Sequence, residues 1–162
     1  MPRLRRCSRR AAVAAGALAL GAALTACGDN GSPEEEVTKS VRNWTAALSE
    51  GDGDSACALM TGGGRIELAR FAQTFAHTAP TADCSANVKR FARKLSPQVQ
   101  RQTHDADVDD VKIDGSLAIV RMADGGPTEI RLRKEGGEWH VDQAFRRGWR
   151  LIGAPNYAQG FR

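Results

Sequence analysis

The residues of this chain best suited to chemistry are its cysteines, because a thiol can form a disulfide, bind a metal, cycle between redox states or carry a lipid. There are four of them: Cys7, Cys27, Cys57 and Cys84. Which chemistry each can do depends on the compartment that it occupies. The segment around the first two cysteines therefore has to be interpreted first.

The first 26 residues have the layout of a secretory signal. Five arginines precede an uncharged stretch of small and aliphatic residues from Ala11 to Ala26. Its 16 residues fall short of the roughly 20 that are needed to span a bilayer. We therefore expect residues 1–26 to be a signal peptide that is removed from the mature protein.

Leu24-Thr25-Ala26-Cys27, at the end of this stretch, resembles the lipobox of bacterial lipoproteins. The resemblance implies that Cys27 becomes the first mature residue and carries a diacylglyceryl group on its sulfur. Its acyl chains would anchor the protein to the outer face of the cell membrane, since each buried methylene contributes about 0.8 kcal/mol. The alternative is an ordinary signal peptide in which Cys27 happens to follow a small residue. Ser8-Arg9-Arg10 also resembles the start of a twin-arginine signal, so the export route stays open.

Removal of the signal changes the charge of the chain. The precursor has 23 Lys and Arg against 19 Asp and Glu and a pI of about 9.1, but five arginines and no acids lie in residues 1–26. The mature chain keeps 18 basic and 19 acidic side chains, a formal charge of −1. This balance gives no argument for a nucleic-acid partner. The remaining 136 residues are enough for one domain.

Cys57 and Cys84 are the thiols that remain once Cys7 is removed and Cys27 is acylated. Outside the cytoplasm the redox poise favours a disulfide between them. This bond would close a loop of about 28 residues and contribute roughly 3.5 kcal/mol on the chain-entropy estimate. The alternative is two separate buried thiols. We expect no metal and no cofactor, because two cysteines 27 residues apart with His77 between them and no CxxC motif lack zinc or redox spacing.

Residues 27–32 are short and polar, which predicts a flexible tether. Ser32 and Glu35 then form a capping box, with Pro33 at the first helical position. An apolar face follows at helical spacing and consists of Val37, Val41, Trp44 and Leu48. These signals predict a helix that ends near Gly51.

Three further helical segments are expected. Asp52 or Asp54 can cap a short helix that carries Cys57. Residues 61–64, Thr-Gly-Gly-Gly, are interpreted as a connector rather than a phosphate loop, because no Gly-Lys-Ser/Thr follows. The next segment has an apolar face that runs from residue 66 to residue 75. Asp83 can cap a longer helix, which Pro97 kinks or ends; its apolar face carries Cys84, Val88, Phe91 and Leu95.

After about residue 106 the hydrophobic pattern changes from helical to alternating. Turn signals divide this region into four strands and lie at Asp114-Gly115, Asp124-Gly125-Gly126 and Glu135-Gly136-Gly137. Each strand has one apolar face, such as Trp139 and Val141 in the last one. The predicted fold class is therefore α+β, with N-terminal helices packed on a curved antiparallel β-meander.

This order of helices and strands resembles the NTF2-like superfamily, particularly short SnoaL-like or cysteine-paired lipoproteins of high-GC actinobacteria. The matching segments are Val41–Leu48, Gly51-Asp52, Ala56–Met60, Cys84, Val111–Gly115 and Glu135–Asp142. The resemblance implies a cone-shaped domain over residues 33–145, in which the sheet and helices enclose a pocket, and relatives often dimerise through the open sheet face. Some members are isomerases or cyclases and many bind without catalysis, so the fold alone does not decide the function.

An enzyme of this kind needs a general base, usually a carboxylate or a histidine, that points into the pocket. His140 and Asp142 share the face of the last strand opposite to its apolar side chains, so we expect them to face solvent. His104-Asp105 falls at the helix-to-strand connection, and His77 falls in a loop. We assign no catalytic residue, and the three histidines form no metal cluster.

Residues 146–162 combine four arginines with Trp149, Tyr157 and Phe161. They form either a tail that packs along the domain or a segment that contacts anionic lipid headgroups or envelope polymer. For the whole mature chain we expect a non-enzymatic module that binds a small apolar ligand or an envelope protein in the cleft between helices and sheet. The alternatives are a SnoaL-like isomerase or cyclase and a scaffold that acts as a homodimer.

Overall fold

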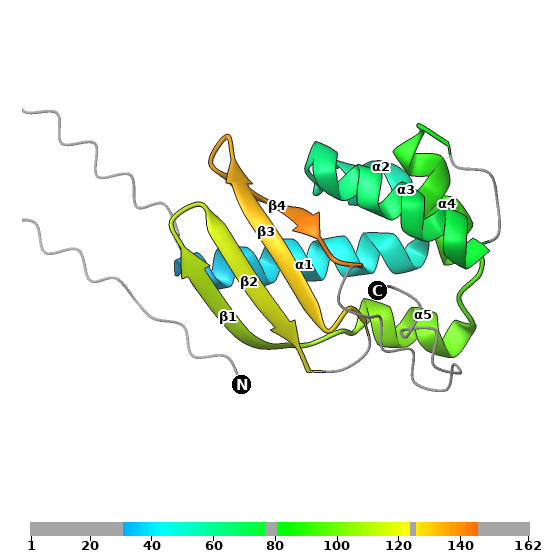
Figure 1. Ribbon diagram of the computed structural model, residues 1–162. Coiled ribbons are helices and arrows are strands. Elements are labelled where there is room, and N and C mark those ends of the chain that lie inside the picture. The colour runs from blue at the N-terminus through cyan, green and yellow to red at the C-terminus, as the bar shows by residue number, and fades with distance from the viewer. Residues whose placement is uncertain (1–30, 77–80, 124–125, 146–162) are drawn as a thin grey trace, which may run out of the picture. The chain divides into compact units, whose positions relative to one another are not determined.

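The computed structural model describes residues 31–76, 81–123 and 126–145. This part of the chain contains five helices packed on a four-stranded antiparallel sheet (Figure 1). The predicted α+β class, with the helices first, is therefore confirmed. The expected signal peptide, Cys27, His77 and the segment 146–162 lie outside the described residues.

Helix α1 (Pro33–Glu50) begins and ends as its sequence predicts. The Ser32 hydroxyl accepts a hydrogen bond from Glu35 N–H at 3.2 Å, and the Glu35 carboxylate accepts one from Ser32 N–H at 2.8 Å. At the other end Gly51 has a φ of 76°, a left-handed conformation that glycine adopts without strain. The predicted apolar face is fully buried and consists of Val37, Val41, Trp44 and Leu48.

Helices α2 (Gly53–Ala58) and α3 (Gly62–Ala76) show that the predicted glycine connector is wrong. The three glycines form the first turn of α3, and the Thr61 hydroxyl accepts a hydrogen bond from Gly64 N–H at 3.0 Å. The physical reason is a close approach of two backbones. A Cβ atom on Gly64 would overlap the carbonyl oxygen of Val141 in the last strand, so only glycine fits there.

Helix α4 (Cys84–Ala92) is capped by Asp83, as predicted, but ends earlier than its apolar pattern indicates. A separate helix, α5 (Pro97–His104), follows it. Ser96 caps α5 and Pro97 takes its first position, where a missing N–H costs nothing. Pro97 therefore begins α5, whereas the sequence predicted only that it kinks or ends the preceding helix.

The sheet has the strand order β1-β2-β3-β4, and each neighbouring pair is antiparallel. The strands are β1 (Val108–Asp114), β2 (Leu117–Met122), β3 (Glu129–Glu135) and β4 (Glu138–Gln143). Between β3 and β4, Gly136 and Gly137 have φ values of 62° and 93°, and a two-residue turn of this kind needs positive φ at both positions. Met60 forms a parallel bridge with Val141, so the connection between α2 and α3 covers the outer edge of β4.

Helix α1 crosses behind the sheet in Figure 1 and covers one of its faces, and the other four helices are gathered beside the sheet. The sheet side chains that face the helices are buried: Ala118, Val120, Ile130, Leu132, Trp139 and Val141. A disulfide joins Cys57 in α2 to Cys84 in α4, so the predicted pairing is present. None of the helices within the described residues is long and apolar enough to cross a bilayer.

Candidate functional site

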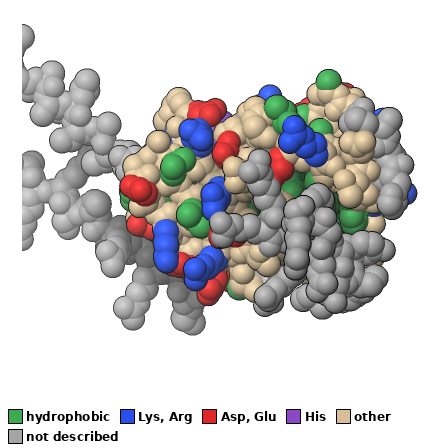
Figure 2. Space-filling view, in the orientation of Figure 1, with side chains coloured by type: hydrophobic (Ala, Val, Ile, Leu, Met, Phe, Trp, Pro, Cys, Tyr) green, Lys and Arg blue, Asp and Glu red, His purple; other side chains and the backbone are tan. Residues whose placement is uncertain are grey.

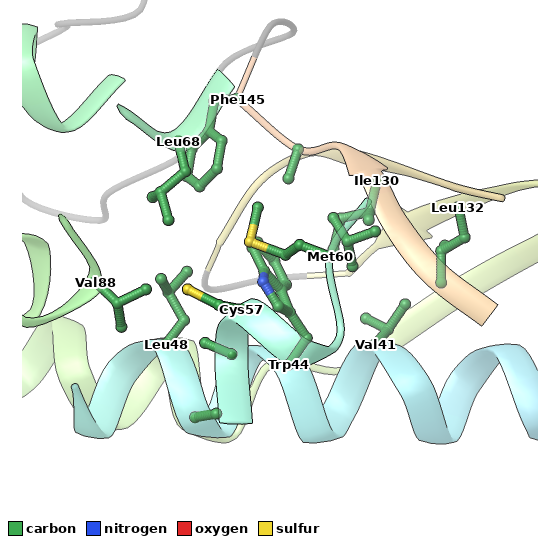
Figure 3. Packing of buried hydrophobic residues seen from close by; sticks show 14 of the residues in the cluster. Val41, Trp44, Leu48, Cys57, Met60, Leu68, Val88, Ile130, Leu132 and Phe145 are labelled. Carbon is green, nitrogen blue, oxygen red and sulfur yellow. The ribbon is translucent and has the colours of Figure 1, made fainter. Parts of the chain in front are cut away.

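The inner part of the expected cleft between helices and sheet is filled by the protein's own side chains. Figure 3 shows Val41, Trp44 and Leu48 rising from α1 toward side chains of the sheet and of the other helices. Trp44 and Ile130 have no exposed surface, and Leu132 is 1% exposed. A ligand site therefore has to be sought at the edge of this core.

Five aromatic rings gather at one edge of the core, and we call them the aromatic cluster: Trp44, Phe71, Phe75, Phe91 and Phe145. They come from α1, α3, α4 and the chain just after β4. Phe145 is central, since its ring centroid lies 4.6 Å from that of Phe71 and 6.0 Å from that of Trp44. Phe75 and Phe91 are 5.5 Å apart.

The aromatic cluster has an outer and an inner side. Phe71 and Phe75 are half-buried and form the outer side, whereas Trp44, Phe91 and Phe145 are buried. On the inner side, the Nε1 atom of Trp44 has no hydrogen-bond partner among the described residues. A buried N–H group without an acceptor costs about 1–3 kcal/mol. Trp139 Nε1 and Thr103 Oγ1 share this lack of a partner, but neither residue belongs to the cluster.

Glu67, near the aromatic cluster, is a carboxylate that was not among the candidate residues predicted from the sequence. It is half-buried on α3, and its Oε2 atom accepts a hydrogen bond at 2.9 Å from the backbone N–H of Ala144, the residue before Phe145. The signal was present, because Glu67, Phe71 and Phe75 are spaced four residues apart and share one helix face. Ile66, which the sequence analysis placed on the apolar face of this segment, is instead 57% exposed.

His140 and Asp142 lie on the face of β4 opposite to its buried side chains, as expected, but they are half-buried there rather than fully exposed. His140 Nδ1 donates a hydrogen bond to the carbonyl of Ala58 at 3.2 Å. The Oδ1 atom of Asp142 accepts one from the Thr61 hydroxyl at 2.7 Å. The cause is the bridge between Met60 and β4, which brings the connection between α2 and α3 against this face of the strand. Both side chains therefore fasten β4 to the helices.

His104 lies on the surface at the end of α5, as the sequence predicts. Its Nδ1 atom is 2.9 Å from Asp105 and its Nε2 atom is 3.2 Å from Glu50 at the end of α1. The hydrogen bond to Asp105 and the negative charges of both acids raise the pKa of His104 above 6.5. His104 therefore forms a surface ion pair that joins the end of α5 to the end of α1.

A separate surface hollow of about 470 Å³ lies on the outer face of α1. Its described lining is polar and carries both signs of charge: Glu34, Glu35, Thr38, Lys39, Arg42 and Asn43. Arg42 is already engaged by Asp107 at 2.9 Å. The lining offers none of the large apolar side chains of the expected cleft.

The outer face of the sheet is exposed and mixes charged with apolar side chains. Figure 2 shows this face, on which Lys and Arg alternate with Asp and Glu around a few hydrophobic side chains. Leu117 and Ile119 on β2 are 47% and 38% exposed. On the neighbouring strand, Arg131 pairs with Glu129 at 3.1 Å. This face is therefore an exposed surface of mixed charge with two exposed apolar side chains on β2.

Comparisons with known proteins add no assignment, since no family model, curated protein or solved structure matches this chain.

Proposed function

We propose that this protein is a membrane-anchored, extracytoplasmic binding module with an NTF2-like fold, and that it performs no chemistry. The lipobox-like segment ending at Cys27 supports the anchor. The disulfide between Cys57 and Cys84 fits an oxidising compartment. The five helices followed by an open antiparallel meander fit the order of an NTF2-like cone.

The aromatic cluster is the proposed ligand site. Its half-buried rings, Phe71 and Phe75, would move apart to admit a small apolar ligand, and an acceptor atom of the ligand would satisfy the N–H group of Trp44. The observation that carries this proposal is that two half-buried aromatic rings belong to the same cluster as a buried donor with no partner among the described residues. Aromatic side chains supply large contact area with few rotatable bonds, which suits reversible binding.

The ligand site is tested by mass spectrometry of molecules that co-purify with the processed protein and by titration with the apolar dye anilinonaphthalene sulfonate. We expect Phe75→Ala to widen the opening and to tighten dye binding severalfold. Ile66→Ala is the matched control, because Ile66 is 57% exposed on the same helix and lies outside the aromatic cluster. Unchanged dye binding in Phe75→Ala, with no co-purified molecule, contradicts the site.

The anchor is tested independently of the ligand. We expect the native protein to carry a diacylglyceryl group on Cys27 and to enter the detergent phase, and we expect Cys27→Ser to remain unprocessed and to lose that partitioning. Processing that globomycin leaves unchanged contradicts the lipoprotein assignment.

An alternative function is a SnoaL-like isomerase or cyclase, and the observation that favours it is Glu67 beside the aromatic cluster. Glu67→Gln separates the two functions, because the amide oxygen still accepts the hydrogen bond from Ala144 but cannot take up a proton. Ligand binding that persists in Glu67→Gln supports the binding module. Loss of turnover of a bound ligand, with binding intact, supports the enzyme.

The other alternative is a homodimeric scaffold, favoured by the exposed Leu117 and Ile119 on the outer sheet face. Light scattering of the processed protein distinguishes it from a monomer. If the protein is a dimer, Ile119→Arg should dissociate it, because the change places an unpaired charge at the centre of the interface.

A further inference from the structure

The two edges of the sheet differ in how they are covered. At the outer edge of β4, the Val141 carbonyl accepts a hydrogen bond from Thr61 N–H at 3.0 Å, and Val141 N–H donates one to the Leu59 carbonyl at 2.8 Å. The connection between α2 and α3 therefore satisfies this edge. At the other edge, β1 pairs with β2 alone among the described strands, and Figure 1 shows β1 at the margin of the sheet. Such an edge is where a further strand can add.

The hydrogen bonds of the sheet show which backbone groups of β1 point outward. The Ser116 carbonyl accepts a hydrogen bond from Lys134 N–H in β3 at 2.8 Å, so the backbone groups of the next residue, Leu117, point toward β1 instead. Leu117 pairs with the last residue of β1, and the direction of the backbone groups alternates along a strand. The N–H and C=O groups of Val111 and Ile113 therefore point away from β2, and they have no hydrogen-bond partner within the described part of the chain.

The side chains of β1 differ between its two faces. On the helix side, Val111 and Ile113 pack against the core but are only half-buried. On the outer side, an acid, a base and an acid alternate: Asp110, Lys112 and Asp114. A strand added at this edge would cover the rest of Val111 and Ile113, and its own side chains would lie directly opposite the three charges.

This charge pattern is complementary to itself when two copies of β1 lie antiparallel. Side chains stay on their own faces only in registers that differ by two residues. A two-fold axis at Val111 sets Asp110 opposite Lys112 of the other copy, and an axis at Ile113 sets Lys112 opposite Asp114; each contact occurs twice by symmetry. An axis at Lys112 sets like charges opposite each other and is disfavoured. The charges therefore favour a second copy in either of two registers.

We propose that β1 pairs antiparallel with β1 of a second copy of this chain and joins the two four-stranded sheets into one. Because the outer edge of β4 is covered, the described sheet offers a free edge at β1 alone, and the assembly closes as a dimer. The interface lies at the edge of the sheet and not on the outer face that carries Ile119. It is also separate from the aromatic cluster and from Cys27, so it depends on neither the ligand site nor the anchor.

The test is sedimentation velocity of the processed protein over a range of concentrations, in a detergent whose density matches that of the solvent. We expect the wild type to form dimers. Lys112→Asp should weaken dimerisation about tenfold, because it sets like charges opposite each other in both registers. An exchange of charges should restore the wild-type affinity. For the axis at Val111 this exchange is Asp110→Lys/Lys112→Asp, and for the axis at Ile113 it is Lys112→Asp/Asp114→Lys.

The matched control is Arg133→Asp, which makes the same change of net charge at an exposed site on β3 and should dimerise as the wild type does. A wild type that stays monomeric at every concentration overturns the proposal. An equal loss in Arg133→Asp, or a loss in Lys112→Asp that neither exchange restores, also overturns it, because net charge or local unfolding would then explain the loss. Dissociation by Ile119→Arg but not by Lys112→Asp overturns it in favour of a dimer through the outer sheet face.

Discussion

At the scale of single residues, His104 is a side chain whose ionisation the structure links to folding. It lies between Asp105 and Glu50 at the C-terminal end of α5, where the helix dipole also favours a cation. These contacts exist only in the folded protein. The folded state therefore binds the imidazole proton more tightly than the unfolded state, whose pKa is near 6.5.

We expect this contribution to stability to be fully present below pH 6.5 and to be lost as the pH rises through the raised pKa of folded His104. The measurement is thermal unfolding of the wild type and of His104→Gln between pH 5 and pH 9. The difference between the two proteins should shrink with rising pH, and Glu50→Gln should reduce it at low pH. A difference that does not change with pH contradicts this role.

At the scale of elements, the start of α3 depends on a backbone contact that side-chain patterns do not reveal. Gly64 lies against the carbonyl of Val141, and Thr61 caps the same turn. Gly62 is in the same turn, but a Cβ atom there would meet nothing within 4 Å. The two glycines therefore form a matched pair for substitution.

We expect Gly64→Ala to destabilise the protein by about 1–3 kcal/mol, because the added methyl forces α3 away from β4. Gly62→Ala should be neutral or stabilising by up to about 1 kcal/mol, since alanine is the better helix former. Urea unfolding of both variants gives the two values. Equal stabilities would mean that α3 does not lie against β4 as described.

Element positions were predictable from the sequence where the signals are local. The capping box and the spacing of Val37, Val41, Trp44 and Leu48 determine α1, and the glycine turns determine the strands. The predicted elements were wrong where a contact or a cap that the hydrophobic pattern does not show determines the local structure. The glycines of α3 resemble a loop until Val141 is placed beside them, and Pro97 begins α5 because Ser96 caps it.

At the scale of the whole molecule, the disulfide between Cys57 and Cys84 restricts the unfolded chain and connects two helices that pack on the core. We expect the double variant Cys57→Ser/Cys84→Ser to lose about 3.5 kcal/mol of unfolding free energy. Urea unfolding with and without dithiothreitol provides the measurement, and reduced wild type should resemble the variant. An oxidised wild type no more stable than the variant contradicts this contribution.

The sequence by itself determined the class of the fold, the start of α1, the turns of the sheet and the pairing of the two cysteines, because these follow from short-range spacing and from the number of thiols. The tertiary structure alone decided which residues meet. In the folded protein, side chains fill the inner part of the expected cleft, and five aromatic rings from distant segments contact one another. Glu67 accepts a hydrogen bond from Ala144, and the connection between α2 and α3 packs against His140 and Asp142. These contacts join residues that are far apart in the sequence. They depend on how the helices pack against the sheet, and a local sequence pattern does not specify that packing.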